Sequence, residues 1–181
     1  MSARRAAVRV RLEQPSRKRE SEFLERVRAS QGLHRPWLQA PRTQAQFREL
    51  VARARADRHA SFFVCTTETS ELAGVINLNE IVRGLFQSAY LGYYAFEPFS
   101  GLGYMSEGLG LVLDQAFGAL GLHRLEANVQ PGNLRSSRLV SELGFRLEGL
   151  SPRYLKISGR WRDHERWAIL ADDWRAKRAR R

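Results

Sequence analysis

The sequence contains little cysteine, little histidine and no long apolar run. Cys65 is the only cysteine, so no disulfide can form within the chain, and a reducing compartment is expected. It lies in the apolar stretch 61–65, which predicts a buried, inert thiol. The four histidines include no close pair, so no metal site is predicted. No apolar run reaches the length of a membrane span, and no apolar region of a signal peptide follows Arg4 and Arg5. We therefore expect a cytoplasmic protein that does not bind membranes.

Acidic residues are scarce relative to basic ones. The chain has 30 lysines and arginines against 19 aspartates and glutamates, a formal net charge of +11. This balance favours anionic partners such as a phosphate-rich cofactor, RNA or the ribosome, but it is equally typical of an arginine-rich soluble surface. The length suits one domain, and no repeat or linker divides it. We predict a single domain over residues 1–171 and a basic, flexible tail over residues 172–181 that could contact RNA.

The spacing of apolar residues predicts an alternation of strands and helices. Strands are expected at 8–12, 62–66, 72–82, 89–96, 123–129, 146–157 and 161–170, and helices at 16–30, 43–58, 104–120 and 134–143. The order is β-α-α-β-β-β-α-β-α-β-β. It predicts an α/β (α+β) fold with a mixed, mostly antiparallel sheet and helices on both faces.

A glycine-bearing turn lies between a predicted strand and a predicted helix. The turn runs from Phe99 to Tyr104 and carries Gly101 and Gly103. Its backbone N–H groups and the helix N-terminus behind them can bind phosphate oxygens. Glycine suits the turn because a Cβ would hinder a positive φ and the approach of an anion. By itself, this pattern is also typical of an ordinary tight turn.

A second turn and helix follow about 25 residues later. Asn133 ends the turn, and Ser136 falls in the first turn of the predicted helix. From the residues alone, Asn133 is most simply a helix N-cap and Ser136 a solvent-exposed helix serine. Neither residue indicates a chemistry without a wider pattern.

Three motifs together supply that pattern. They are G-x-G-Y-x-x-E at 101–107, N-x-x-S at 133–136 with L-G-F at 143–145, and G-R-W-R-D-H at 159–164. With them the chain resembles the GNAT acyltransferase superfamily, most closely the RimJ/RimL group of ribosomal-protein alanine N-acetyltransferases and RimJ in particular. The resemblance implies the GNAT fold, in which two central strands splay apart. It also implies acetyl transfer from acetyl-CoA to an amine, with no metal.

The resemblance also implies which residues bind acetyl-CoA. A strand edge would pair with the pantetheine arm, the glycine turn would bind the pyrophosphate, and the asparagine of N-x-x-S would bond the arm. Ser136, near the sulfur, would be a catalytic residue that protonates the leaving thiolate. The implied cofactor-binding residues are Tyr94, Ala95, Phe96, Ser100, Gly101, Leu102, Gly103, Tyr104, Met105, Asn133 and Ser136.

The general base and the acceptor site are less clearly marked. No Ser-His-Asp or Cys-His grouping supports a covalent intermediate, so direct attack by the amine is expected. Leu155 stands nearest to the position where the RimL branch places a glutamate. Glu80 is the remaining candidate base, or else a charged strand end.

Trp37 either covers the core or walls the acceptor site. Asp163 and His164 either bind the acceptor ammonium or hold a hairpin turn.

The absence of a clear base favours one class of acceptor. A protein α-amine has a pKa near ~7.7–8.0 and lysine near ~10.4, so only the α-amine is appreciably deprotonated at neutral pH. We therefore expect a protein N-terminus as acceptor, most simply of a ribosomal protein, with ribosome association. The alternatives are a small-molecule amine acetyltransferase with a detoxifying role, or a basic RNA- or ribosome-binding protein on a GNAT scaffold. The chain could be a monomer or a homodimer.

Overall fold

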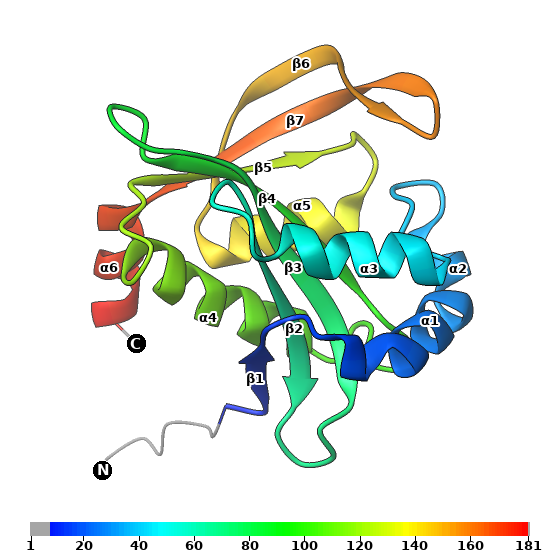
Figure 1. Cartoon of the computed structure of the whole chain (residues 1–181). Coiled ribbons are helices and arrows are strands. Elements are labelled where there is room, and N and C mark those ends of the chain that lie inside the picture. The colour runs from blue at the N-terminus through cyan, green and yellow to red at the C-terminus, as the bar shows by residue number, and fades with distance from the viewer. Residues whose placement is uncertain (1–7, 181) are drawn as a thin grey trace.

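The computed structural model describes residues 8–180, so the interpretations of Arg4, Arg5 and residue 181 lie outside the described part of the chain. Seven strands form one sheet in the order β1-β2-β3-β4-β5-β7-β6 (Figure 1). The strands are β1 Val10–Glu13, β2 Ala60–Thr66, β3 Leu72–Val82, β4 Ser88–Ala95, β5 Arg124–Val129, β6 Arg146–Ile157 and β7 Arg160–Leu170. The α-helices are α1 Glu20–Ala29, α2 Gln31–His34, α3 Gln44–Arg53, α4 Tyr104–Phe117, α5 Leu134–Leu143 and α6 Ala171–Ala179, and a 3-10 turn, η1, spans Arg17–Arg19.

The sheet is mixed, as predicted. β4 and β5 are parallel, and every other neighbouring pair is antiparallel. Helices α1 and α3 pack on one face, and α4 and α5 pack on the other. Among residues 8–180, no helix combines the length and the apolar character needed to cross a bilayer.

Two apolar cores lie on the two faces of the sheet, because side chains alternate along each strand. On β3, Ile76 and Leu78 point into the core under α4, whereas Val75 points toward the helices of the other face. That second core is aromatic, with Phe23 of α1 lying 4.8 Å, ring centre to ring centre, from Phe47 of α3. Burial of such side chains stabilises the fold by roughly 1.5–3 kcal/mol each.

Glycine in β3 lets α4 approach the sheet closely. A Cβ on Gly74 would lie 2.3 Å from Met105 Sδ and 2.8 Å from the Tyr94 carbonyl oxygen. No larger residue fits without displacing one of them. The start of α4 is therefore fixed against β3 and β4.

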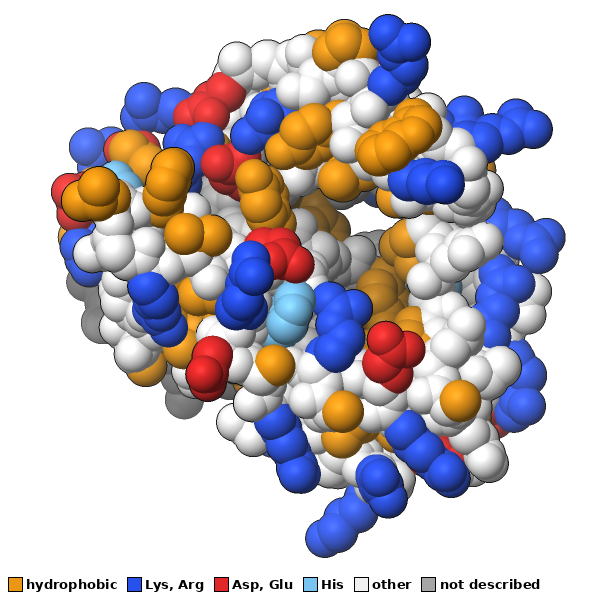
Figure 2. Space-filling view, turned by 45° about the horizontal axis from the view of Figure 1, so that its top comes forward, with side chains coloured by type: hydrophobic (Ala, Val, Ile, Leu, Met, Phe, Trp, Pro, Cys, Tyr) orange, Lys and Arg blue, Asp and Glu red, His pale blue; other side chains and the backbone are white. Residues whose placement is uncertain are grey.

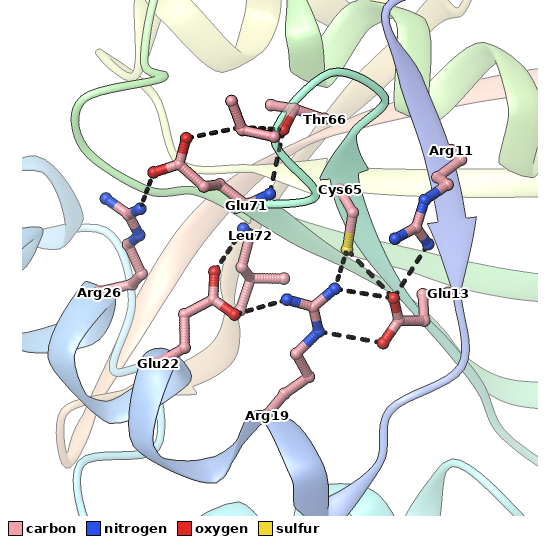
Figure 3. A network of polar contacts seen from close by, with 10 residues as sticks. Arg11, Glu13, Arg19, Glu22, Arg26, Cys65, Thr66, Glu71 and Leu72 are labelled. Atoms are coloured by element: carbon pink, nitrogen blue, oxygen red, sulfur yellow. Dashed lines mark hydrogen bonds and ion pairs between the residues drawn. The ribbon is translucent and has the colours of Figure 1, made fainter.

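Polar contacts attach α1 to the sheet (Figure 3). Arg19 donates to both carboxylate oxygens of Glu13 at the end of β1, at 3.0 and 2.9 Å. Glu22 accepts from the backbone N–H of Leu72 at 2.7 Å, which caps the beginning of β3. The Arg19 guanidinium lowers the pKa of Glu13 to about 2. These contacts position α1, which leads through α2 to the loop that carries Trp37.

Cys65 lies in the middle of this network but is fully buried. Burial raises the pKa of its thiol to about 11, so the thiol stays protonated at neutral pH. A thiol in this state is a poor nucleophile. The prediction of an inert cysteine is confirmed.

The structure differs from the predicted helices in two places. The helix expected over 16–30 is divided into the 3-10 turn, α1 and the short α2. The helix expected to reach Arg58 ends at Arg53, after which 3-10-type turns follow. Its last core-facing residue is Val51, and residues 52–58 carry no apolar side chain larger than alanine to bury.

The C-terminal segment also differs from the expected flexible tail. Residues Ala171–Ala179 form α6, and the Trp174 side chain is 2% exposed. Its indole N–H donates to Asp114 Oδ1 of α4 at 2.8 Å, and Arg178 donates to the other oxygen at 2.8 Å. Trp174 is the one large apolar side chain of the helix, and polar contacts of its neighbours add to the docking.

Replacing this anchor should destabilise the protein. We expect Trp174→Ala to lower the free energy of unfolding by about 3 kcal/mol, because a buried aromatic ring is lost. Arg180→Ala, at an exposed position on the same segment, should change it by less than about 0.5 kcal/mol. Urea unfolding of the two variants measures both values, and equal midpoints would contradict the docking of α6.

Candidate active site

The central feature is a gap between the two parallel strands. β4 and β5 pair only over Ser88–Leu91 and Arg124–Ala127. β4 then continues beside β3 to Ala95, and β5 continues beside β7 to Val129 (Figure 1). Beyond these residues, β4 stays paired with β3 and β5 stays paired with β7, but β4 and β5 no longer pair with each other. The inner edge of β4 beyond Leu91 is therefore free to pair with an extended ligand.

Only alternate residues of β4 present their backbone to this gap. Phe96 N–H donates to Ala73 O at 2.8 Å, so Phe96 and, by alternation, Tyr94 face β3. Tyr93 and Ala95 face the gap. The Ala95 carbonyl already accepts from His34 Nε2 at 2.8 Å. Of the residues predicted to bind the arm, Ala95 therefore presents its N–H to the gap, whereas the backbone of Tyr94 and Phe96 pairs with β3. Tyr93 supplies the other free backbone groups at the gap.

The glycine turn leads from this edge into α4. Gly101 and Gly103 have φ of 79° and 86°, and Gly103 is the N-cap of α4. The first N–H groups of a helix have no partner within it, so those of Tyr104 and Met105 are available to an anion. The turn brings Ser100, Leu102 and these residues together at one helix end, as the sequence predicts. The geometry suits a pyrophosphate.

Arg9, just before β1, braces the turn. Its Nε donates to Glu107 Oε1 at 2.6 Å, and its Nη2 donates to the Leu102 carbonyl oxygen at 3.0 Å. The guanidinium also lies 4.7 Å from the ring centre of Tyr104. Glu107 is thus engaged in holding Arg9 at the helix N-terminus. The pair is neutral overall, so it holds the turn in place and does not add net charge beside the proposed anion site.

On the far side of the gap, α5 presents the second motif. Asn133 is the N-cap of α5, and its Oδ1 accepts from Ser136 N–H at 3.3 Å. Ser136 is half-buried, and its Oγ lies 2.6 Å from the hydroxyl oxygen of Tyr93. This hydrogen bond spans the gap between β4 and α5. Burial raises the pKa of Tyr93 to about 12, so its hydroxyl stays protonated at neutral pH.

A polar cavity opens on the opposite face of β4. It has a volume of about 580 Å³ and lies between α3 and the strands. It is lined by Gln39, Ala40, Pro41, Arg42, Thr43, Gln46, Glu49, Leu50, Arg53, His59, Ser61, Asn77, Asn79 and Tyr94. Figure 2 shows the molecule deeply hollowed in this region, between the β6–β7 part and the helices below it. The cavity reaches β4 at Tyr94, which stands between Tyr93 and Ala95, the two residues that face the gap.

Trp37 lies near the end of the gap. Its carbonyl oxygen accepts from Gln130 Nε2 at 2.7 Å, and its ring approaches Gly132. The loop after α2 therefore touches the turn between β5 and α5. This contact places Trp37 beside the turn that follows β5, and its role as a wall of the acceptor site stays a prediction.

The other predicted acceptor and catalytic residues are not gathered at the gap. Asp163 Oδ1 accepts from Arg153 N–H at 2.7 Å and so holds the β6–β7 hairpin. His164 is buried, with Nδ1 3.0 Å from the Arg162 carbonyl oxygen, and burial lowers the pKa of its imidazole. Glu80 sits at a β-bulge of β3, half-exposed and paired with Arg58 at 2.6 Å. The structure does not bring these residues together with Ser136.

Among residues 8–180, no group of three or more histidine, cysteine or acidic side chains is placed to hold a metal.

Comparison with known proteins agrees with this geometry. A family model described as an acetyltransferase (GNAT) domain matches residues 9–146. The chain belongs to the GNAT acetyltransferases. It is 39% identical over 107 residues to the [ribosomal protein uS5]-alanine N-acetyltransferase of Escherichia coli, covering 59% of this chain and about half, 55%, of the relative.

Solved structures extend the comparison over most of the fold. RimJ of Mycobacterium smegmatis in complex with CoA-disulfide aligns with a TM-score of 0.83 at 29% identity, over 91% of this chain and 83% of that one. The spermidine N-acetyltransferase of Vibrio cholerae, in complex with CoA and spermine, shares the fold, with a TM-score of 0.78 at 22% identity over 93% and 99%. The predicted GNAT fold is confirmed. The chain is an acetyl-CoA-dependent N-acetyltransferase.

Sequence reasoning missed three contributors to the site. Tyr93 belongs to the strand expected at 89–96, but its side-chain contact with Ser136, 43 positions away, was not predicted. Arg9 reaches Glu107 across 98 positions. The polar cavity had a visible signal, because Asn77 and Asn79 alternate with apolar residues in an otherwise buried strand. Alternate strand positions share a face, so this pattern indicates a polar patch on the α3 side.

A substitution in the turn should weaken cofactor binding. We expect Gly103→Glu to raise the Kd for acetyl-CoA at least about tenfold, because it adds strain at φ 86°, a contact with Arg9 and a negative charge beside the phosphates. Gly121→Glu is a matched control, since Gly121 has φ 62° and open space around it. Calorimetric titration measures both Kd values, and equal weakening would contradict a phosphate site at Gly103.

The buried Tyr93 hydroxyl should make stability fall at high pH. Its pKa in the folded protein is about 12, above the value near ~10 expected when unfolded. Between these values the unfolded chain releases the proton and the folded one keeps it, so the free energy of unfolding falls by up to about 1.4 kcal/mol per pH unit. Burial also raises the pKa of Tyr94.

Tyr93→Phe should therefore show a shallower loss of stability above pH ~10 than the unsubstituted protein. Denaturant unfolding at several pH values from 8 to 11 measures the slopes. Parallel curves for the two proteins would show that Tyr93 is not held neutral.

Proposed function

We propose that this enzyme transfers acetyl from acetyl-CoA to the N-terminal α-amine of a protein, and that a ribosomal protein is its acceptor. The observation that carries the proposal is the arrangement around β4. A free strand edge and a phosphate-suited turn lie on the α4–α5 side, and a polar cavity reaches the same strand from the α3 side. Acceptor and cofactor would meet at the gap between β4 and β5.

The residues around the gap have distinct proposed roles. The backbone of Tyr93 and Ala95 pairs with the pantetheine arm, Asn133 borders it, and the turn from Ser100 to Met105 holds the pyrophosphate. Acetyl-CoA supplies an activated acetyl group as a thioester. Ser136 Oγ, held by the Tyr93 hydroxyl, is placed to donate a proton to the leaving thiolate. Because the Tyr93 hydroxyl that contacts Ser136 stays protonated, it supports proton transfer from Ser136 to the thiolate.

Direct attack by the amine balances the reaction without a covalent intermediate. The amine nitrogen forms a bond to the acetyl carbon, the carbon–sulfur bond breaks, and the amine loses one proton while the thiolate gains one. An α-amine with a pKa near ~7.7–8.0 is already about one-tenth free base at neutral pH, so it needs little help from a base. This suits a site in which the candidate base Glu80 is paired with Arg58 away from the gap.

Charge favours a peptide over a polyamine as the acceptor. Arg42 and Arg53 line the cavity, and Glu49 is the one carboxylate among its lining residues. A polyamine carries several positive charges, which two guanidinium groups would repel. A peptide N-terminus carries one positive charge at most. The 39% identity to an enzyme named for ribosomal protein uS5 also supports a protein acceptor.

The β6–β7 hairpin offers support for ribosome association. Arg153, Lys156, Arg160 and Arg162 are exposed near its tip, and the neighbouring Trp161 is 61% exposed. Basic side chains around an exposed aromatic ring are suited to RNA phosphates and bases. The hairpin would hold the enzyme close to its acceptor.

The acceptor class can be tested with two peptides. We expect a peptide with a free N-terminal alanine to gain one acetyl group on incubation with enzyme and acetyl-CoA. A peptide with a blocked N-terminus and an internal lysine should gain none, because its amine is protonated at neutral pH. Intact-mass spectrometry measures both. Acetylation of the lysine peptide alone would contradict the proposal, and acetylation of spermidine but neither peptide would favour a small-amine enzyme.

A further inference from the structure

Four buried side-chain atoms in the described part of the chain have no hydrogen-bond partner. They are His59 Nδ1, Tyr94 Oη, Asn128 Oδ1 and Arg166 Nε. A buried polar atom without a partner is costly and uncommon in folded proteins. Such atoms near a substrate site point to groups that a ligand supplies. Their positions therefore carry information about the acceptor.

All four atoms belong to one face of the sheet. His59 and Tyr94 line the cavity beside α3. On β5, Glu126 pairs with Tyr90, which lies four residues before Tyr94 and so on the same face. Asn128 follows Glu126 by two residues and shares that face. Arg166 lies directly opposite Asn128 on β7, so it shares the face as well.

Asn128 also stands at the edge of the gap. The pairing of β4 with β5 ends at Ala127, and Asn128 is the next residue of β5. An acceptor that comes from the α3 side to reach the gap must pass this residue. Asn128 as a whole is half-exposed, although its Oδ1 is buried, so binding of an acceptor there requires the amide group to turn about its terminal torsion.

Arg166 is held so that one donor remains unused. Its Nη2 pairs with Glu126, and its guanidinium lies 4.8 Å from the ring centre of Tyr154. These contacts fix the plane of the group and leave the Nε–H without a partner. Asn128 and Arg166 are thus paired residues of neighbouring strands, one with an unused acceptor and the other with an unused donor.

We infer that Asn128 and Arg166 bind the first peptide bond of the acceptor chain. A peptide bond presents one N–H and one C=O, which match the Asn128 amide oxygen and the Arg166 Nε–H. A polyamine has N–H groups but no carbonyl, so it cannot satisfy both atoms. The inference rests on the proposed function and adds how a peptide would be distinguished from a free amine.

The test replaces one atom of the substrate. An acceptor peptide with N-terminal alanine is compared with its depsipeptide analogue, in which an ester oxygen replaces the first peptide N–H. The unsubstituted enzyme should prefer the amide by about tenfold in kcat/KM, the effect of one hydrogen bond to a neutral partner. Asn128→Leu should reduce the preference to about one, mainly by lowering kcat/KM for the amide.

The ratio of the two substrates is measured on one enzyme sample, so incomplete folding of a variant cancels. Asn128→Asp keeps an acceptor oxygen and should keep the amide preference. An unchanged preference in Asn128→Leu would overturn the inference while leaving N-terminal acetylation intact. If the unsubstituted enzyme binds acetyl-CoA but acetylates neither substrate, the proposed function fails, and the inference fails with it.

Discussion

The separation of β4 from β5 is the constraint on which the rest of the structure depends. Four residues of each strand are paired, and beyond them each strand remains bonded only to its outer neighbour. The sheet thus consists of two antiparallel units, β1-β2-β3-β4 and β5-β7-β6, which are joined by the short parallel pairing of β4 with β5. Helices α4 and α5 follow the two diverging strands and place their N-termini beside the opening. The cofactor elements therefore gather there because of topology.

Much of the fold could be predicted because its signals are local. Periodicity identified β3, α5 and β6 at the limits that the structure has, and glycine or proline marked the neighbouring turns. The segments that were misjudged depend on distant contacts. The last helix, α6, docks because the indole N–H of Trp174 donates to Asp114 of α4, 60 positions earlier in the chain. Arg175, Lys177 and Arg178 add contacts with Phe117, Glu142 and Asp114, which the polar composition of the tail did not reveal either.

The site likewise combines local features, which the sequence predicts, with distant contacts, which it does not. The glycine turn and the Asn133 cap are short-range structures, so the local sequence predicts them, and the resemblance to the GNAT superfamily implies their role in binding acetyl-CoA. The pairing of Tyr93 with Ser136, and the bracing of the turn by Arg9, arise only when the chain folds. Conversely, Asp163 and His164 belong to a recognisable string, but the structure uses them within the hairpin. A motif fixes residue types, whereas the direction of each side chain depends on strand register.

The placement of the two binding regions on opposite faces of one sheet has a kinetic consequence. The Tyr93–Ser136 contact lies with α4 and α5, and the polar cavity lies with α3. On the proposed function, the acceptor and the cofactor have separate entrances, and neither occupies the path of the other. Separate entrances would allow a ternary complex to form without a compulsory order of addition. Free CoA then competes with acetyl-CoA alone, and the acetylated product can depart while CoA is still bound.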